Sequence, residues 1–154
     1  MIAKQGSGTS LAALDDTHLP ILITTFRGHI ALEMAQWHHG ATSRVLRQRH
    51  GLGLPIVYIT DAHAMHVPSA TVRKYWADIM KQNEAMMNAM LGNFVVLDNP
   101  VMRGALTAIE WVTRLTQRIR YVATLEQAIV EANRVLVEHG HPPVSLDVSG
   151  YRVA

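Results

Sequence analysis

The chain has 154 residues, of which 49% are hydrophobic and 17% are charged, with a formal net charge of +2 and no cysteine. A chain of this length forms about one domain with a sizeable core, and its apolar runs fall short of the ~20 residues that span a bilayer, so neither a disordered nor a membrane-spanning protein is indicated. The lack of cysteine excludes disulfides, iron–sulfur clusters, thiolate zinc sites and a cysteine nucleophile, and without a signal-peptide core in the first residues we expect a cytoplasmic protein.

The first third of the chain predicts a hairpin, a helix and a buried strand. Residues 9–14 and 20–26 are strand candidates, and the turn residues between them join the two in a hairpin. A helix is expected over residues 30–50, with glycines at its end. The apolar, β-branched run 55–60 predicts a central strand that ends at Asp61. The apolar face expected for the helix consists of Ile30, Met34, Trp37, Ala41, Val45 and Leu46.

The next segment predicts a loop and a second helix. The loop over residues 62–68 contains two histidines, and Ser69 follows it, where its hydroxyl can cap the free backbone N–H groups of a helix over residues 70–90. The apolar residues of this helix cover more than one stripe, although packing on a sheet needs only one. The second stripe, rich in methionine, is either a partner surface or core that fills gaps.

The last part of the chain predicts two further strands, each followed by a helix. Residues 93–97 form a strong strand, and Pro100 begins a helix that should reach about residue 117. A short strand over residues 119–123 precedes a helix that Thr124 caps, with a glutamate and a glutamine close behind that complete a near capping box.

The domain organisation follows from where this last helix stops. Gly140 ends it, and the tail over residues 141–154 has two prolines and no helical period, so the tail is either flexible or lies along the body. We expect a single α/β domain over residues 1–140 followed by this tail. Strands that alternate with helices after an initial hairpin predict a mostly parallel central sheet with an N-terminal hairpin strand and about four helices.

This element order and four sequence stretches resemble the SpoIIAA-like, or STAS-type, domains of bacterial anti-sigma-factor antagonists and their STAS/SEC14 relatives. The stretches are PILITTFRG, PIVYITDA, NFVVLDNPVMRGAL and YVATLEQAI, and the likeness covers residues 8–140. The last two look most like the family, with Arg103 at the polar entry of a helix and a T-x-E-x-A pattern that begins at Thr124. The resemblance implies a non-enzymatic signalling domain that binds a protein partner.

The resemblance also implies a phosphorylation site, because STAS antagonists place a phosphorylatable serine or threonine at the start of the helix behind the central strand. Ser69 occupies that place, with Thr71 nearby, but residue 68 is proline where the family has aspartate, and no glycine follows the serine. A phosphate on Ser69 would add about two negative charges beside the free N–H groups of a helix N-terminus. The alternative is that Ser69 acts only as an N-cap.

We expect the partner to bind around Asp61, His63, His66, Ser69 and Thr71. Ligands and partners usually meet open α/β sheets beyond the carboxyl ends of the strands. The D-x-H-x-x-H spacing also permits zinc ligation, but no fourth ligand can be assigned, so neither a metal nor another cofactor is predicted. No G-x-S-x-G elbow projects the serine as a nucleophile, so no enzymatic activity is predicted.

The second hypothesis is a carrier or sensor of an apolar small molecule. SEC14-like relatives use the same layers to enclose an apolar compound, and Trp76, Met80, Met87 and Trp111 could line such a cavity. The same residues are also candidates for the face of a homodimer on the second face of the helix over residues 70–90, and a homodimer excludes neither hypothesis. Nucleic-acid binding is not expected, because the basic residues form no stripe interleaved with aromatic side chains.

Overall fold

The computed structural model of the chain describes residues 1–112 and 119–151, with the backbone alone described at residues 7 and 108–112. Within this part, six strands form one sheet in the order β1-β2-β3-β4-β5-β6. Neighbouring strands are antiparallel from β1 to β3 and parallel from β3 to β6. The strands are β1 (Ile2–Ser7), β2 (Ser10–Asp15), β3 (Ile21–Gly28), β4 (Val57–Met65), β5 (Gly92–Val96) and β6 (Arg120–Val122). The predicted α/β class with a mostly parallel sheet is confirmed.

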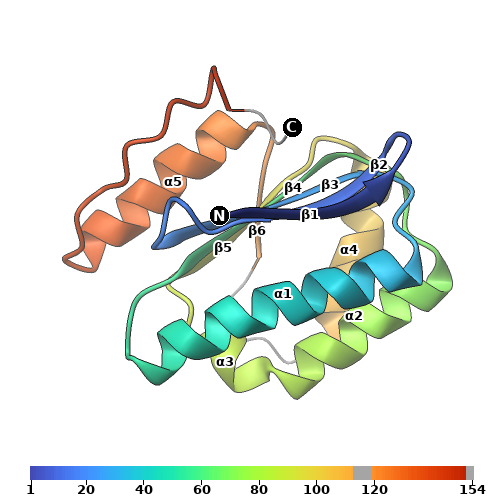
Figure 1. The fold of residues 1–154 in the computed structure, drawn as a ribbon, viewed down its shortest axis with the longest axis horizontal. Coiled ribbons are helices and arrows are strands. Elements are labelled where there is room, and N and C mark those ends of the chain that lie inside the picture. Colours follow the sequence, from blue (N-terminus) through green and yellow to red (C-terminus); the bar gives the residue numbers. More distant parts are fainter. Residues whose placement is uncertain (113–118, 152–154) are drawn as a thin grey trace.

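The helices divide unequally between the two faces of the sheet. Figure 1 shows α1, α2, α3 and α4 on one face and α5 on the other. Consecutive parallel strands that advance across a sheet in one direction place their right-handed crossovers on the same face, which accounts for the first group. None of the described helices is both long and apolar enough to cross a bilayer. The helices are α1 (Leu32–Gly51), α2 (Ala70–Gln82), α3 (Glu84–Asn88), α4 (Pro100–Val112) and α5 (Leu125–Glu138).

The predicted hairpin is present as β2 and β3, and a further strand precedes it. β1 pairs antiparallel with β2 at the edge of the sheet, and most of its residues are exposed. Its sequence, IAKQGS, has no apolar alternation, so the pattern does not predict a strand there. An edge strand with one solvated side needs little apolar content, and a lysine in it discourages pairing with other chains.

The prediction that the central strand ends at Asp61 is wrong, and so is the predicted loop over residues 62–68. β4 continues to Met65, which pairs with Gly28 at the end of β3. The register shifts after Asp61, so that residues 62 and 63 lie opposite a single residue of β3, which is a β-bulge. The neighbouring strand supplies hydrogen-bond partners to residues 62–65, AHAM, whose sequence lacks the β-branched residues that favour a strand.

The single helix predicted over residues 70–90 is also wrong, because Asn83 divides it into α2 and α3. The Asn83 side chain donates from Nδ2 to the carbonyl oxygen of Ile79 at 2.9 Å, and its backbone N–H donates to the same oxygen at 3.0 Å. Asparagine favours such local bonds over a continuing helix. This division raises the number of helices above the expected four. α4 is described to Val112, and its predicted end near residue 117 lies outside the described residues.

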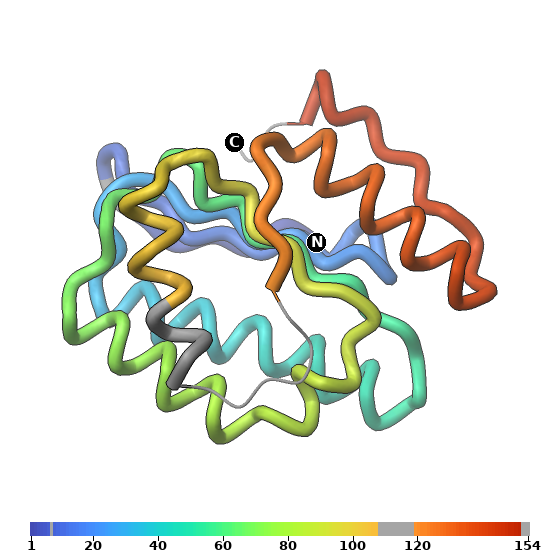
Figure 2. Tube along the Cα trace, turned by 180° about the vertical axis from the view of Figure 1, so that it is seen from behind, coloured from blue at the N-terminus to red at the C-terminus, as the bar shows by residue number. Residues whose placement is uncertain are grey.

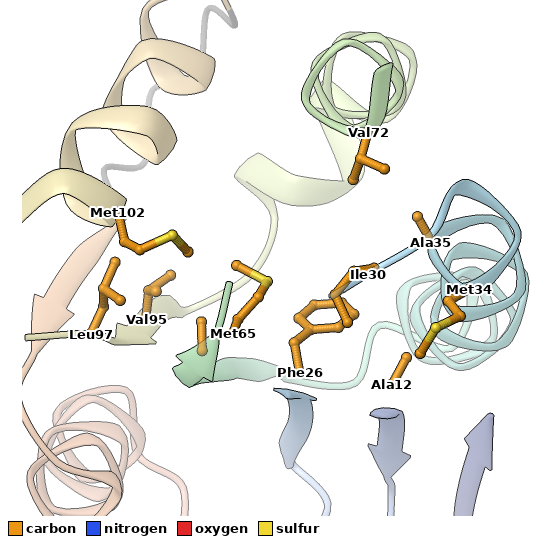
Figure 3. Packing of buried hydrophobic residues seen from close by; sticks show 11 residues of the cluster. Ala12, Phe26, Ile30, Met34, Ala35, Met65, Val72, Val95, Leu97 and Met102 are labelled. Carbon is orange, nitrogen blue, oxygen red and sulfur yellow. The ribbon is translucent and has the colours of Figure 1, made fainter. Parts of the chain in front are cut away.

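The core is split by the sheet into two layers. On the face toward α1, α2 and α4, the side chains of Phe26, Met65 and Val95 point from the strands toward Val72 of α2 and Met102 of α4 (Figure 3). On the other face, strand residues pack against the buried side of α5. These strand residues are Ile21, Ile23, Val57, Ile59, Phe94 and Val96.

The tail after α5 lies along the body, which is one of the two alternatives left open by its sequence. Figure 2 shows it running back beside α5. The Asn133 side chain bonds both backbone groups of Val144, accepting from its N–H at 2.7 Å and donating to its carbonyl oxygen at 2.9 Å. Tyr151 donates its hydroxyl to Asp15 of β2 at 3.0 Å. The tail thereby extends the cover that α5 gives to the sheet.

The N-cap of α5 can be tested by substitution of Thr124. Thr124 Oγ1 accepts from the Gln127 N–H at 3.2 Å, and Gln127 Oε1 accepts from the Ala123 N–H at 3.0 Å. We expect Thr124→Ala to lower the free energy of unfolding by about 1 kcal/mol, measured by urea denaturation, because a backbone donor loses its partner. Thr107→Ala is the matched control inside α4, where the hydroxyl donates to the Arg103 carbonyl at 2.8 Å. That variant should change stability by only a few tenths of a kcal/mol, because alanine is the better helix former. Equal losses in the two variants would contradict the capping role.

Candidate functional site

The start of α2 lies at the edge of the sheet where the parallel strands end (Figure 1). Ser69 is extended, with φ −62° and ψ 159°, and its Oγ accepts a hydrogen bond from the Val72 N–H at 3.2 Å. Arg73 donates from Nη1 to the Pro68 carbonyl oxygen at 2.7 Å and fixes the residue before the cap. The predicted N-cap role of Ser69 is confirmed, and its phosphorylation stays a prediction.

The surface around Ser69 is open and partly apolar. Ser69 and Thr71 are both exposed. Val67, in the loop before α2, has 46% of its surface exposed, and Val101, in the first turn of α4, has 69%. Because α2 and α4 pack against each other, the two valines belong to the same edge of the sheet. A contiguous exposed apolar patch rimmed by polar residues is a feature of surfaces that bind proteins.

Asp61 and His63 form a close pair within β4. His63 Nδ1 lies 2.5 Å from Asp61 Oδ1, and the His63 N–H donates to the same oxygen at 3.4 Å. Asp61 is buried, whereas 54% of the His63 side chain is exposed. Strand alternation places Asp61 on the face of Val57 and Ile59, which is the α5 face. The pair therefore lies on the opposite side of the sheet from the body of α2.

The remaining histidine of the D-x-H-x-x-H pattern stands apart from this pair. His66 is exposed in the loop after β4, and its N–H donates to the Gly28 carbonyl oxygen at 2.9 Å. Gly28 has φ +65°, and a Cβ there would lie 2.9 Å from the Thr9 carbonyl oxygen, so only glycine fits. Within residues 1–112 and 119–151, no three histidine or acidic side chains are close enough together to hold a metal ion.

A second buried carboxylate, Asp15, holds the tail on the α5 face. Asp15 accepts from the Tyr151 hydroxyl at 3.0 Å and from the Thr17 hydroxyl at 2.5 Å. Burial alone raises the pKa of this carboxyl, but the hydrogen bonds from Thr17 and Tyr151 and the nearby His18 outweigh it and hold the pKa below its usual value. Burial, and next the charge of Asp15, raise the pKa of the Tyr151 hydroxyl. Both groups are thereby kept in the states that form the bond.

A cavity of about 180 Å³ lies on the other face of the sheet, between the strands and helices α1 to α4. Trp76, Met80 and Met87, predicted to line a cavity or a dimer face, all border it. The side chain of Trp111, the fourth residue of that prediction, lies outside the described residues. Most of the lining is apolar, and the polar part is formed by His38, His39, Thr42, Ser43, Tyr58, Thr60, Asn83, Asn93 and Tyr121.

A hydrogen-bonded network connects α1 to the sheet at this cavity. His38 Nε2 lies 3.0 Å from the hydroxyl oxygens of both Thr24 and Thr42. The Thr24 hydroxyl is also 2.8 Å from the hydroxyl of Tyr58. These bonds satisfy polar groups that would otherwise be buried without partners, which would cost about 1–3 kcal/mol each. The network therefore allows a helix with polar residues on its inner face to pack against the sheet.

Burial controls the protonation of this network. It lowers the pKa of His38 to about 3, with the neighbouring His39 adding to the effect, so His38 is neutral at pH 7. Burial also raises the pKa of the Tyr58 hydroxyl, against hydrogen bonds from threonine hydroxyls that lower it. The His38 ring packs edge-on against Phe26 with centroids 4.7 Å apart, and Phe26 contacts Trp76 at 5.5 Å. The cavity wall is thus aromatic and uncharged beside the network.

His39, the next residue of α1, has one ring nitrogen without a partner. Its Nδ1 is 3.1 Å from the Tyr75 hydroxyl of α2. Its Nε2 is buried and makes no hydrogen bond, and the residue borders the cavity. A buried ring nitrogen without a partner is rare enough in folded proteins to require an explanation.

The face that α1 buries includes the predicted apolar residues and, beside them, polar ones. Met34 and Leu46 are buried, whereas Trp37, Ala41 and Val45 are partly buried and pack against the core. The buried polar residues of the helix face the sheet, and the hydrogen-bonded network supplies partners for the His38 and Thr42 side chains. This burial of polar residues could have been predicted from the sequence, because the polar positions 38 and 42 are four residues apart and lie between apolar residues of the same helical face. The residues of α1 that are buried are Met34, Ala35, His38, Thr42, Ser43 and Leu46.

Comparison with known proteins identifies the fold. No family model matches the chain, and no curated protein matches it. Among solved structures, an uncharacterized protein from the DUF3478 family with a SpoIIAA-like fold, from Shewanella loihica PV-4, matches at a TM-score of 0.53 and 14% identity. This match covers 86% of the present chain and 92% of that one.

A second solved structure leads to the same result. An anti-sigma factor antagonist from Mycobacterium paratuberculosis matches at a TM-score of 0.51 and 18% identity, over 86% of this chain and 94% of that one. At these identities the likeness concerns the fold. The predicted SpoIIAA-like, STAS-type fold is confirmed.

The burial of His38 predicts how the free energy of unfolding depends on pH. The unfolded chain takes up a proton on this residue below about pH 6.5, whereas the folded chain does so only near pH 3. The unfolding free energy should therefore fall as the pH is lowered from 6.5, with a slope approaching about 1.4 kcal/mol per pH unit from this residue. We expect His38→Gln to reduce the slope between pH 6.5 and 5 by most of that amount, measured by urea denaturation at each pH. His50→Gln, exposed at the end of the same helix, should keep the wild-type slope. An unchanged slope in His38→Gln would show that His38 does not control this pH dependence.

Proposed function

We propose that this chain, which has the SpoIIAA-like fold, is a non-enzymatic regulatory domain that binds a protein partner at the carboxyl ends of its parallel strands. The observation that carries the proposal is the exposed N-cap Ser69, which follows the exposed Val67 by two residues. The proposed surface comprises Asp61, His63, His66, Ser69 and Thr71, extended by Val67 and Val101. The match to an anti-sigma factor antagonist supports a role of this kind.

The contribution of each side chain to this surface follows from its environment. The exposed ring of His63 is oriented by the buried Asp61 carboxylate, so it presents its other edge to a partner. Val67 and Val101 supply apolar area that a partner can remove from water, at about 25 cal/mol per Å². Ser69 and Thr71 are exposed at the start of α2.

Phosphorylation of Ser69 would switch such a surface. A phosphate there would add about two negative charges next to the N–H groups of the first turn of α2, one of which, that of Val72, already donates to Ser69 Oγ, so the helix would stay folded. Arg73, already turned back to the Pro68 carbonyl, lies within the same turn. A partner with acidic groups opposite Ser69 would be repelled, and binding would cease while the fold remains.

The second candidate function is a carrier or sensor of an apolar small molecule. The observation that favours it is the cavity of about 180 Å³ bordered by Trp76, Met80 and Met87. Flexible, polarizable methionine side chains suit the lining of such a site. Because these side chains border the cavity, their position supports a ligand site more than the face of a homodimer. A dimer through the exposed part of α2 is compatible with either function.

A pair of substitutions at Ser69 separates its roles in stability and in binding. Ser69→Asp retains a good N-cap and adds a negative charge, whereas Ser69→Ala removes the cap and adds none. We expect Ser69→Asp to keep wild-type stability within about 0.5 kcal/mol and to weaken the partner complex at least tenfold. Ser69→Ala should lose about 1 kcal/mol of stability but bind like the wild type.

The partner is first obtained by affinity purification from the source organism with quantitative mass spectrometry, and its affinity for each variant is then measured by calorimetry. Gln48→Asp is the control, because it adds the same charge on an exposed site near the end of α1, at the opposite edge of the sheet. Unchanged affinity of a stably folded Ser69→Asp variant would contradict the proposed surface.

A further inference from the structure

We propose that His63 is a phosphoryl acceptor, whose Nε2 takes a phosphoryl group from a donor that carries a phosphoramidate or acyl-phosphate bond. This inference goes beyond the proposed function, because it concerns a chemical step on the chain itself and needs no partner complex. Three features lead to it: the bond of His63 to a buried carboxylate, the exposure of its ring, and an arginine without a partner on the neighbouring strand.

The contact between Asp61 and His63 decides which ring nitrogen is free to react. Asp61 is buried, and its Oδ1 lies 2.5 Å from Nδ1 of His63. A carboxylate only accepts hydrogen bonds, so Nδ1 carries the proton and Nε2 of the neutral ring carries a lone pair. The same arrangement orients the histidine of serine hydrolases, where the carboxylate also stabilises the positive charge that forms on the ring. His63 is therefore held in the tautomer that makes Nε2 a nucleophile.

The outer edge of the His63 ring faces solvent. More than half of the side chain, 54%, is exposed, although the carboxylate that it contacts is buried. Nδ1 is the nitrogen held against the buried carboxylate, so the exposed part of the ring is the edge that carries Nε2. His63 also does not border the apolar cavity on the other face of the sheet. A donor can therefore approach Nε2 from solvent without any opening of the fold.

Arg27 supplies a positive charge on the same face of the sheet. It pairs with Ala64 across β3 and β4, directly after the bulge that contains His63. Strand alternation places Arg27 on the α5 face, where the Asp61–His63 pair also lies. Arg27 is half-buried, and within the described part of the chain its guanidinium makes no hydrogen bond or ion pair. A guanidinium without a partner suits a phosphoryl group, because it can bind two of the oxygens at once.

The end of the tail gives a second indication that these charges lie close together. Burial and then the charge of Asp15 raise the pKa of the Tyr151 hydroxyl most. Smaller effects come from Asp61, which raises this pKa, and from Arg27, which lowers it. Because the interaction between charges falls with distance, Asp61 and Arg27 both lie near the Tyr151 hydroxyl. The two charges therefore belong to one cluster on the α5 face.

The transfer from phosphoramidate needs no further reactant. The lone pair of Nε2 forms a bond to phosphorus, the P–N bond of the donor breaks, and the protonated nitrogen leaves as ammonia with the electron pair of that bond. The His63 ring keeps its Nδ1 proton and becomes a phosphoimidazolium, whose positive charge the Asp61 carboxylate stabilises. Arg27 offsets the negative charge on the phosphoryl oxygens. With an acyl phosphate as donor, the leaving group is a carboxylate.

The test treats the complete chain with potassium phosphoramidate at neutral pH. Phosphorus NMR distinguishes phosphate on Nε2 from phosphate on Nδ1, and mass spectrometry without acid treatment assigns each site. We expect His63 to be phosphorylated on Nε2 at least tenfold faster than the exposed His66 and His139 of the same molecule. His139 is the matched internal control, because its Nδ1 lies 2.8 Å from a neutral carbonyl oxygen, that of Val135, instead of a carboxylate.

Two substitutions test the groups around His63. Asp61→Asn removes the buried charge, and Arg27→Gln removes the guanidinium but leaves the Asp61–His63 pair, so it serves also if the first variant does not fold. Each should slow the labelling of His63 at least fivefold and leave that of His139 unchanged. Arg47→Gln, at an exposed position of α1, is the control for the loss of one positive charge and should label as the wild type does.

Three results would overturn the inference. They are a wild-type rate at His63 less than tenfold above those of His66 and His139, a rate that neither folded variant changes, and a phosphate on Nδ1 of His63. Because the labelling needs no partner, each of these results leaves the partner-binding surface proposed above standing. That surface is decided separately by the affinity of the Ser69→Asp variant.

Discussion

The strands β3 to β6 follow one another across the sheet in chain order, and each connection between them crosses in the same direction. Right-handed crossovers then place α1, the α2–α3 pair and α4 on a single face. The other face receives only α5, and the tail has to lie beside it to complete the cover. Both candidate sites are products of this arrangement. The starts of three helices meet the ends of the strands at one edge, and the cavity lies beneath the same helices.

Polar residues on the inner face of α1 distinguish this molecule from a simple apolar packing of helix on sheet. A helix with His38 and Thr42 toward the strands can be buried only where the strands return hydrogen bonds, and Thr24 and Tyr58 do so. The same polar residues keep the helix and sheet from closing into a fully apolar layer, and they border the space that remains. The network and the cavity therefore both result from the polar residues on the inner face of α1.

Features encoded within a few neighbouring residues were predictable from the sequence. The caps at Ser69 and Thr124 are of this kind, because a cap joins a side chain to an N–H group three residues later. The same holds for the strongly apolar strand β5. The end of β4 was not predictable, because residues 62–65, AHAM, include no β-branched residue and become a strand only through their pairing with β3.

The candidate sites also combine features that the sequence predicts with features that it does not. The position of Ser69 in the sequence was enough to indicate the surface around it. The network, in contrast, joins Thr24 to His38 and to Tyr58, which are separated from it by 14 and 34 positions in the chain, and no local pattern contains such contacts. Strand alternation separates Asp61 from the α2 face, although the two segments are close in sequence. The orphan nitrogen of His39 depends on the rotation of α1 and on the placement of α2, and both are set by packing.

The two faces of the sheet are also completed at different times during synthesis. All six strands precede α5 in the chain, so the ribosome has made the whole sheet and the helices of one face before the first residue of α5 exists. Until α5 and the tail emerge, the apolar side chains of Ile21, Ile59 and Phe94 on the other face have no cover. Exposed apolar surface of this kind makes incomplete chains prone to associate with one another. The last thirty or so residues, which contribute little to either candidate site, therefore determine whether the nascent sheet stays free of aggregation.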